Sequence, residues 1–503
     1  MIFDQAARDP GGLALDDLTR QRSWAELADR TTRIARLLRG ELGLRPDDHA
    51  AVLIGNRLEL VEITLAAVQA GIWITPINWH LSPREMAYII EDSGARVVFS
   101  DARFEATARE AGAAHVLLTG EELDAALASA SDEPMPLDGP AGGNMIYTSG
   151  TSGRPKGVKR KRGGSLGQTL ATQDAAAASF GLDGSGPHLV TGPLYHAGPL
   201  LFAVYDQGNG APIVILPHWD EERGLEVIQE REIAHTHLVP TMFVRLLRLP
   251  DSVRERFHAP ALRLVLHGAA PVSPAVKRRM IEWWGEILVE YWGGTEGGTC
   301  TMANSADWLA HPGTVGKPLP SWEVFAVDDA GRRLSTGENG LLYSRHKRMT
   351  DPFEYHGAPE KTAEAYLEPG VFTLGDVGHV DADGYVYLAD RKSNMIISGG
   401  VNIYPAEIEQ VLDEHPAVAD VGVFGIPDDE WGESVKAAVE LRPGFEPSPE
   451  LEAEILAFGR EQLAGYKVPR SIDFEPELPR HPTGKLFVRQ LRERYWADRG
   501  RSI

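Results

Sequence analysis

The chain has 503 residues, is 43% hydrophobic and 24% charged, and carries a formal net charge of −22 at pH 7. This length exceeds one hydrophobic core, so two or more domains are expected, and the acidic balance argues against a nucleic-acid-binding surface. A single cysteine, Cys300, excludes intrachain disulfides and a cysteine-based zinc site. The N-terminus lacks the pattern of a signal peptide, and no apolar run approaches the roughly 18 residues of a transmembrane helix. We therefore expect a soluble, cytoplasmic protein.

Helix and strand patterns alternate over the first part of the chain. The apolar spacing predicts a helix over residues 59–70 and a strand over residues 72–77. Ser82 followed by Pro83 and Glu85 predicts a helix start with a capping box, and Ser273-Pro274 predicts another start after an apolar strand. Such alternation predicts α/β layers with largely parallel sheets.

The pattern changes in the last 200 residues. From about 310 to 390, short β segments alternate with Asp/Gly turns, which predicts a β-rich subdomain. Beyond this stretch a new set of helix and strand patterns begins. We predict an α/β protein in which residues 1–392 form a large N-terminal domain of layered α/β sheets that includes the β-rich part. Residues 393–503 are predicted to form a small α+β C-terminal domain.

The most informative segment is a loop of glycine and hydroxyl residues within 147–157, which follows a short apolar strand. Glycines let successive backbone N–H groups point into one concavity, and such a concavity binds anions. The hydroxyls add donors, and Lys156 adds a positive charge. The residue order differs from that of a P-loop NTPase. A plain surface loop is the alternative for such a run taken alone.

Four further segments favour a nucleotide site when they are taken together with this loop. They carry Glu296 on a glycine turn, Asp376 beside glycines after an apolar strand, Arg391 where the second domain starts, and Lys485 in a Gly-Lys turn near the C-terminus. Each segment alone fits an ordinary turn. Five such segments in this order are too specific for chance.

This set of segments resembles the adenylate-forming (ANL) superfamily, which includes acyl-CoA synthetases, peptide-synthetase adenylation domains and firefly-type luciferases. The similarity runs from about residue 20 to residue 490, and the acyl-CoA synthetase branch is the most similar. The resemblance implies a reaction in two steps. A carboxylate attacks the α-phosphorus of ATP to give an acyl-adenylate and pyrophosphate, and the thiol of coenzyme A then displaces AMP. ATP, Mg²⁺ and coenzyme A are therefore the expected cofactors and co-substrate.

The resemblance also implies a set of site residues for the nucleotide. Those implied for ATP and AMP binding are Thr148, Ser149, Gly150, Thr151, Ser152, Gly153, Lys156, Gly268, Ala269, Ala270, Trp292, Gly293, Thr295, Asp376, Arg391 and Lys485. The loop would hold the β- and γ-phosphates, and Glu296 would bind Mg²⁺ with the hydroxyl of Thr148 nearby. Asp376 and Arg391 would bind the ribose, and Trp292 would stack on adenine against residues 268–270.

Lys485 would bridge the substrate carboxylate and the α-phosphate, where it would stabilise charge in the transition state. In the superfamily the C-terminal domain rotates to remove this lysine, so the small domain is expected to be mobile. The hinge aligns with Ser393, where many relatives have Asp or Lys. Ser398, Gly399 and Gly400 would border the pantetheine tunnel, with a plain β-turn as the alternative. The segment around Lys485 also matches the site at which relatives are switched off by lysine acetylation.

The acyl pocket is implied by the same resemblance. Its predicted residues are His196, Val239, Gly293, Gly294 and Gly298, and the predicted catalytic residues are Lys485, Glu296, Thr148 and His196. His196 would be a gate beside the carboxylate, where amino-acid-activating relatives have an Asp. The glycines either widen the pocket wall or only make a flexible turn. The apolar surroundings favour a hydrophobic monocarboxylic acid: a fatty, aryl, or steroid or terpenoid side-chain acid.

Two other functions stay open as alternatives to an acyl-CoA synthetase. One is an adenylating enzyme that loads its acyl group onto a carrier-protein thiol. The other is a catalytically silent binding protein on the same scaffold, against which the retained charged residues argue. The oligomeric state is not readable from the sequence, and a homodimer is one candidate.

Three further sequence features are not interpreted as functional sites. His235 and His237 have the spacing of two metal ligands on a strand, but no third ligand follows. Cys300 has no readable base partner, so a core residue is the better interpretation. The basic run 159–162 is interpreted as a solvated face, with contact to a CoA phosphate or an anionic lipid surface as the alternative.

Overall fold

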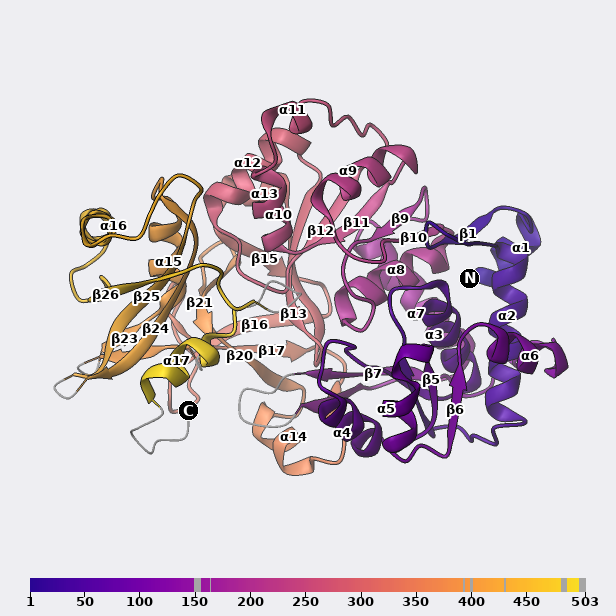
Figure 1. The fold of residues 1–503 in the computed structure, drawn as a ribbon. Helices are drawn as coiled ribbons and strands as arrows, with labels where there is room; N and C mark the ends of the chain where they lie inside the picture. Colours follow the sequence, from indigo (N-terminus) through magenta and orange to yellow (C-terminus); the bar gives the residue numbers. More distant parts are fainter. Residues whose placement is uncertain are drawn as a thin grey trace.

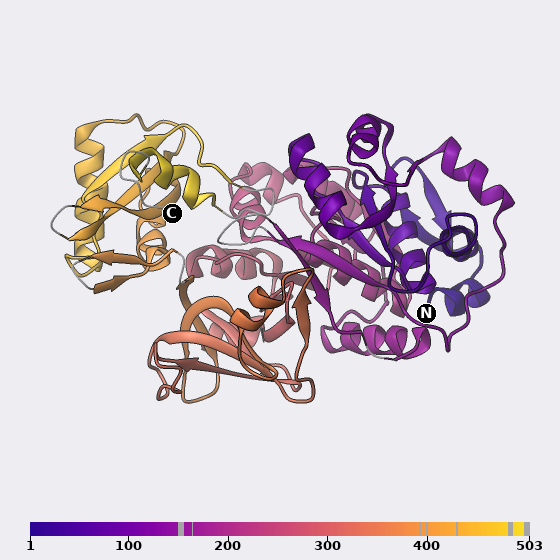
Figure 2. The ribbon, with the colours of Figure 1, turned by 90° about the horizontal axis from the view of Figure 1, so that it is seen from below.

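The computed structural model describes residues 1–148, 155–162, 164–391, 394–398, 401–428, 431–480 and 486–496, apart from the side chains of Arg391 and Asn402. In this part of the chain, three β-sheets flanked by helices make up the fold (Figure 1). Figure 2 shows the C-terminal part, coloured orange to yellow, at one end of the molecule. Within the described ranges, no helix is both long enough and apolar enough to cross a membrane.

The largest sheet joins a parallel half to an antiparallel half. Its strands are β1 (Leu13–Asp16), β2 (Gln21–Ser23), β9 (His188–Val190), β10 (Ile213–Ile215), β11 (His235–Leu238), β12 (Leu264–His267), β13 (Leu288–Gly294), β14 (Gly298–Asn304), β15 (Thr314–Pro318), β16 (Trp322–Val327), β17 (Gly340–His346), β19 (Tyr366–Glu368), β20 (Val371–Val380) and β21 (Val386–Arg391). The order β1-β10-β9-β11-β12-β13 is parallel throughout. From β13 the pairing becomes antiparallel through β14, β15, β21, β20 and β17 to β16. The predicted β-rich stretch is thus continuous with the parallel half.

The second sheet lies in the N-terminal part and has the order β18-β8-β7-β4-β3-β5-β6. Its strands are β3 (His49–Leu53), β4 (Trp73–Pro76), β5 (Ala95–Ser100), β6 (His115–Leu118), β7 (Gly143–Thr148), β8 (Lys156–Arg160) and β18 (Phe353–Tyr355). All five residues of β3 are buried, as expected for a central parallel strand covered on both faces. The edge strand β18 comes from the β-rich stretch, so it ties that stretch to this sheet.

The third sheet belongs to the C-terminal part and has its own apolar core. It consists of β22 (Ile396–Ser398), β23 (Val401–Ile403), β24 (Val418–Asp428), β25 (Gly432–Leu441) and β26 (Ser471–Glu475), with the helices α15 (Pro405–Asp413), α16 (Pro449–Gln462) and α17 (Val488–Trp496). The mixed α/β class is therefore as predicted.

The remaining helices cover the two larger sheets. They are α1 (Ile2–Arg8), α2 (Trp24–Arg39), α3 (Leu58–Ala70), α4 (Pro83–Ser93), a 3₁₀ turn (Ala102–Phe104), α5 (Glu105–Glu110), α6 (Glu121–Ser129), α7 (Leu166–Ser179), α8 (Ala197–Asn209), α9 (Glu221–Glu230), α10 (Pro240–Leu247), α11 (Asp251–Arg254), α12 (Pro274–Trp284), α13 (Ser305–Ala310) and α14 (Pro359–Ala365). The predicted capping box of α4 is confirmed, because Ser82 accepts from the backbone N–H of Glu85 and Glu85 accepts from that of Ser82. Ser273 caps α12 with its side chain alone, by accepting from the backbone N–H of Val276.

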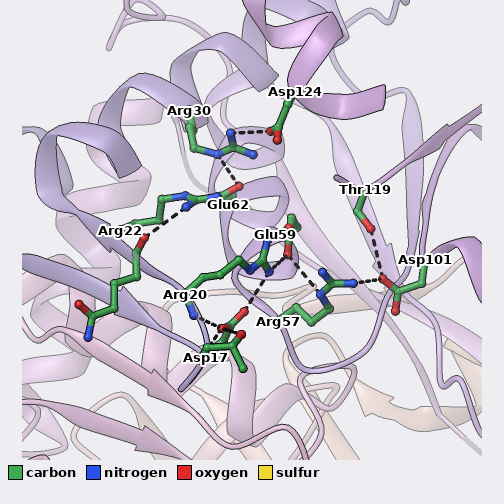
Figure 3. A network of polar contacts seen from close by, with 12 residues as sticks. Asp17, Arg20, Arg22, Arg30, Arg57, Glu59, Glu62, Asp101, Thr119 and Asp124 are labelled. Carbon is green, nitrogen blue, oxygen red and sulfur yellow. Dashed lines mark hydrogen bonds and ion pairs between the residues drawn. The ribbon is translucent and has the colours of Figure 1, made fainter. Parts of the chain in front are cut away.

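Helix α3 is fixed by two buried carboxylates (Figure 3). Glu59 is 1% exposed and accepts from Arg20 at 2.6 Å. Glu62 is fully buried and lies between Arg22 at 3.0 Å and Arg30 at 2.9 Å. Because a buried charge is tolerated only when it is paired, these contacts attach α3 to β2 and α2.

Candidate active site

Thr148 and Lys156 lie opposite each other where the predicted phosphate loop begins and ends. β7 and β8 pair antiparallel, and Thr148 is the register partner of Lys156. The loop residues Ser149, Gly150, Thr151, Ser152 and Gly153 lie outside the described residues. Nζ of Lys156 lies 5.1 Å from the centre of the Tyr355 ring. The strand pair thus fixes the two ends of the loop and holds the lysine beside an aromatic ring.

Glu296 lies in the turn that joins β13 to β14, and its carboxylate is held by Tyr355. The phenol donates a hydrogen bond of 2.9 Å to Oε1 of Glu296. Burial, assisted by the nearby charge of Glu296, raises the pKa of Tyr355, so the phenol stays a hydrogen-bond donor. Lys156, Tyr355 and Glu296 therefore form one chain of contacts, with a cation and a carboxylate on either side of the phenol. Hard carboxylate oxygens of this kind suit Mg²⁺.

Tyr355 was missed by the sequence reasoning. It reaches the site because β18 pairs antiparallel with β8, with Tyr355 opposite Val158. The backbone N–H of His356 also donates to the carbonyl of Gly157. Strand pairs between segments this far apart in sequence leave no local pattern, so no signal in the sequence pointed to this residue.

The glycines beside Glu296 are required by the close packing of the β13–β14 hairpin. A Cβ on Gly293 would lie 2.0 Å from the carbonyl oxygen of Gly298, and one on Gly297 would lie 2.4 Å from Phe372. Gly298 has a φ of +73°, a left-handed conformation that favours glycine. Backbone packing is therefore sufficient to explain these residues. A wider acyl pocket at Gly293, Gly294 and Gly298 stays a prediction.

Asp376 lies on β20, where the indole of Trp292 holds its carboxylate. Nε1–H of Trp292 donates to Oδ2 of Asp376 at 2.9 Å, and the two residues are 6% and 7% exposed. Asp376 is the register partner of Arg391 on β21. The carboxylate thus has a fixed orientation. The ribose contacts of Asp376 and Arg391 and the stacking of Trp292 on adenine stay predictions.

Residues 268–270 follow directly after β12, at the carboxyl edge of the parallel half of the largest sheet. Ligands of open α/β sheets bind at this edge. Ala269 has a φ of +68°, a strained conformation for a residue with a side chain. A Cβ on Gly268 would lie 2.6 Å from the carbonyl oxygen of Tyr291, so the segment lies tight against β13. Strain held in place by such packing supports a functional role for the segment.

His196 and Val239 both follow parallel strands of this sheet. His196 is the N-cap of α8, and Val239 is the N-cap of α10 directly after β11. The ring of His196 lies 4.4 Å from that of Tyr195. Both predicted acyl-pocket residues therefore begin helices that leave the carboxyl edge of the parallel strands.

Several predicted residues fall where no structure is described. Lys485, Ser393, Gly399 and Gly400 lie outside the described residues, so their roles stay predictions. Ser398 ends β22, where it pairs with Val401 on β23.

The histidines of β11 contact side chains of the protein itself. Nδ1 of His235 lies 2.8 Å from Asp206, which also lies 2.9 Å from Nδ1 of His188. Nε2 of His237 lies 3.0 Å from the hydroxyl of Tyr291. Each histidine thus has a polar partner in the core.

The other discounted signals also have clear surroundings. Cys300 is buried, and burial raises the pKa of its thiol to about 12, which fits the expected core residue. The basic run differs from a simple solvated face. Lys159 and Arg162 lie over the ring of Trp73, at 5.2 and 4.0 Å from its centre.

Comparisons with known proteins agree with this arrangement. The family model "AMP-binding enzyme" matches residues 2–351, and "AMP-binding enzyme C-terminal domain" matches residues 407–485. The fatty acid–[acyl-carrier-protein] ligase ScoC of Streptomyces coeruleorubidus is 33% identical over 96% of this chain and 93% of its own length. A feruloyl-CoA synthase of an Amycolatopsis species is also 33% identical, over 96% of this chain and 95% of its own. The structure of ATP-bound MatB from Rhodopseudomonas palustris has a TM-score of 0.86 at 29% identity, and the match covers 99% of this chain and 98% of that one.

The chain therefore belongs to the AMP-binding enzyme family, the adenylate-forming enzymes. Within this class it is an ATP-dependent acid–thiol ligase of the acyl-CoA synthetase type. The resemblance found in the sequence is confirmed.

Proposed function

We propose that this enzyme activates a hydrophobic monocarboxylic acid as its adenylate and transfers the acyl group to the thiol of coenzyme A. One observation carries the residue-level proposal: the β13–β14 hairpin holds both Glu296, which Tyr355 connects to Lys156, and Trp292, whose indole orients Asp376. A cation, a hard carboxylate and an oriented second carboxylate are what a metal–nucleotide complex needs.

Each of these residues has a separate role in the first step. Lys156 would neutralise charge on the β- and γ-phosphates, which leave as pyrophosphate, and residues 149–153 would donate hydrogen bonds to them. Glu296, with the hydroxyl of Thr148, would hold Mg²⁺, which neutralises further phosphate charge when bound. Tyr355 positions the carboxylate of Glu296. Asp376 accepts from the ribose hydroxyls.

Lys485 supplies the charge that stabilises the transition state at the α-phosphate. We propose that residues 393–503 move as a domain about a hinge at Ser393, so that the lysine is present only in the first step. The guanidinium of Arg248, just after α10, donates to the backbone carbonyl of Ala419 in the C-terminal part. A rotation would break this contact between the two parts.

Transfer to a carrier-protein thiol is the second candidate for the last step. The similarity to ScoC, which is named for an acyl carrier protein, supports it, whereas the similarity to feruloyl-CoA synthase supports coenzyme A. Both relatives match over nearly the whole chain at 33% identity, so identity alone does not favour either acceptor. We propose a cytoplasmic location, and a homodimer stays one candidate for the oligomeric state.

The experiment measures AMP formation with Mg-ATP and a panel of acids, from acetic through fatty and aryl acids to steroid side-chain acids, with and without coenzyme A. Lys485→Ala is the control. CoA-dependent AMP release that disappears in the control supports the proposal. Adenylate formation without turnover of coenzyme A would instead support the loading of a carrier-protein thiol. Mass determination of the purified protein under native conditions tests the dimer.

A further inference from the structure

A buried polar pair lies between the parallel strands and α8. Nε2 of His237 lies 3.0 Å from the hydroxyl of Tyr291, and the imidazole is 3% exposed. In the sheet, His237 is in register with Leu266, and Leu266 with Val289. Tyr291 is two residues beyond Val289 on β13, so the two side chains project from the same face of the sheet.

The first turn of α8 closes over this pair. A Cβ on Gly198 would lie 3.2 Å from Cε1 of His237 and 3.2 Å from the hydroxyl of Tyr291. The ring of Phe202, one turn further along α8, lies 5.5 Å from that of His237 and 5.1 Å from that of Tyr291. Three rings therefore fill the space beneath the start of α8.

This position adjoins both predicted acyl-pocket residues. Gly198 is two residues after His196, and His237 is two residues before Val239. Tyr291 directly precedes Trp292, whose indole contacts Asp376, so consecutive residues of β13 project toward opposite faces of the sheet. Tyr291 and the proposed adenine-stacking residue Trp292 thus share strand β13.

We propose that Tyr291 and His237 form the floor of the acyl pocket, where their rings limit the length of the acid and their polar atoms recognise a neutral hydrogen-bonding group at its far end. The acid class that fits is a compact aryl acid with a ring hydroxyl. This inference rests on the proposed function and narrows its substrate.

The chemistry of the pair supports a neutral group in particular. Burial lowers the pKa of His237 to about 3, so the imidazole is uncharged near neutral pH. An uncharged floor provides no positive charge to balance a second carboxylate, whose burial would then be costly. The phenol both donates and accepts, so it can exchange its partner for a substrate hydroxyl. A long alkyl chain would need the three rings to move.

The test compares wild type with Tyr291→Phe, Tyr291→Ala and a matched control, Tyr205→Phe. Tyr205 lies on α8 and packs on the same apolar cluster, but it lines a separate cavity beneath α1. The acids are benzoic, 4-hydroxybenzoic, cinnamic, 4-hydroxycinnamic, hexanoic and dodecanoic acid. kcat and KM for AMP formation are measured separately for each acid. Affinities for non-reactive acyl-adenylate analogues are measured by calorimetry.

We expect the wild-type enzyme to have a kcat/KM for each hydroxylated aryl acid that is about 10-fold or more above that for the unsubstituted analogue. Tyr291→Phe removes one oxygen, and it should abolish most of this preference through KM while the melting temperature stays near that of wild type. Tyr291→Ala should raise kcat/KM for dodecanoic acid by about 10-fold or more, because it opens the floor. Tyr205→Phe should change neither profile.

The inference is overturned if wild type activates dodecanoic acid as well as any aryl acid. It is equally overturned if folded Tyr291 variants keep the wild-type preferences. Analogue affinities report on the floor independently of turnover. Loss of turnover with every acid would therefore count against the proposed function, while the affinities still decide whether Tyr291 sets the acyl specificity.

Discussion

The phenol of Tyr355 donates a 2.9 Å hydrogen bond to Oε1 of Glu296, although the two residues belong to different sheets. The same ring lies 5.1 Å from the ammonium of Lys156. Tyr355 therefore connects the strand that ends the phosphate loop to the turn that carries the proposed Mg²⁺ ligand. The contact fixes one oxygen of Glu296, so under the proposed role it would orient this carboxylate toward Mg²⁺.

Tyr355→Phe should lower the apparent affinity of the enzyme for Mg²⁺ while leaving the fold intact. Groups that orient a metal ligand typically change metal affinity about 10- to 100-fold when they are removed. The Mg²⁺ concentration that gives half-maximal AMP formation should rise by about this factor at fixed ATP. Tyr366→Phe is the matched control, since Tyr366 donates to the backbone carbonyl of Phe353 instead. An unchanged Mg²⁺ dependence in Tyr355→Phe would remove the positioning role.

Asp376→Asn should lose the discrimination between ATP and 2′-deoxy-ATP. Under the proposed role, the carboxylate of Asp376 accepts from the ribose hydroxyls, so the deoxynucleotide would leave an acceptor unpaired and its KM should be about 10-fold or more higher in wild type. The asparagine keeps one acceptor oxygen for Trp292 but weakens the ribose contact. KM for both nucleotides is the measurement. Equal discrimination in variant and wild type would contradict a ribose contact at this residue.

Glu62→Ala should strongly destabilise the N-terminal part. Its removal leaves Arg22 and Arg30 without their shared buried carboxylate. Breaking a buried ion pair in this way costs about 3–5 kcal/mol of unfolding free energy. Asp29→Ala is the control, because Asp29 pairs with Arg33 at the surface and should cost less than about 1 kcal/mol. The free energy of unfolding of both variants is measured in urea. A loss in Glu62→Ala no larger than that in Asp29→Ala would contradict the stabilising role of the buried contact.

Asp206 should make stability depend on pH in the acid range. Burial alone would raise its pKa, but hydrogen bonds from His188 and His235 outweigh burial and lower it to about 2. The unfolded carboxyl has a pKa of about 3.9, so the stabilisation is complete above that value and is lost as pH falls through about 2. This stabilisation contributes on the order of 2 kcal/mol to the free energy of unfolding.

The check is the unfolding free energy of wild type and Asp206→Asn between pH 2 and pH 7. The difference between them should be constant above about pH 5 and should shrink as the pH falls. A difference that is independent of pH down to 2 would show that Asp206 contributes through packing alone.

Local features of the fold were predictable because their causes are local. The start of α4 at Pro83 and its end before Gly94, which has a φ of +65°, follow from a capping box and a left-handed glycine. The start of α12 follows from the side-chain cap of Ser273 and from Pro274 in the first turn. In each case a few neighbouring residues satisfy the free backbone groups of a helix end.

Contacts between distant segments were not predictable in this way. The pairing of β18 with β8 brings Tyr355 to Glu296, and the register of β11, β12 and β13 brings His237 to Tyr291. Both depend on which strands become neighbours. The glycines of the β13–β14 turn were ambiguous for a related reason, because only the hairpin reveals the collision that a Cβ on Gly293 would cause.

The continuous backbone pairing from β14 through β15 to β21 also limits how this enzyme can be recombined with its relatives. β14 pairs with β15 at Thr301 and Met302, and β15 pairs with β21 near Val386. A chimera joined near residue 310 would place a strand from one parent against an edge shaped by the other, and an unmatched edge invites aggregation. Joints placed after β21 keep every strand of the largest sheet from a single parent.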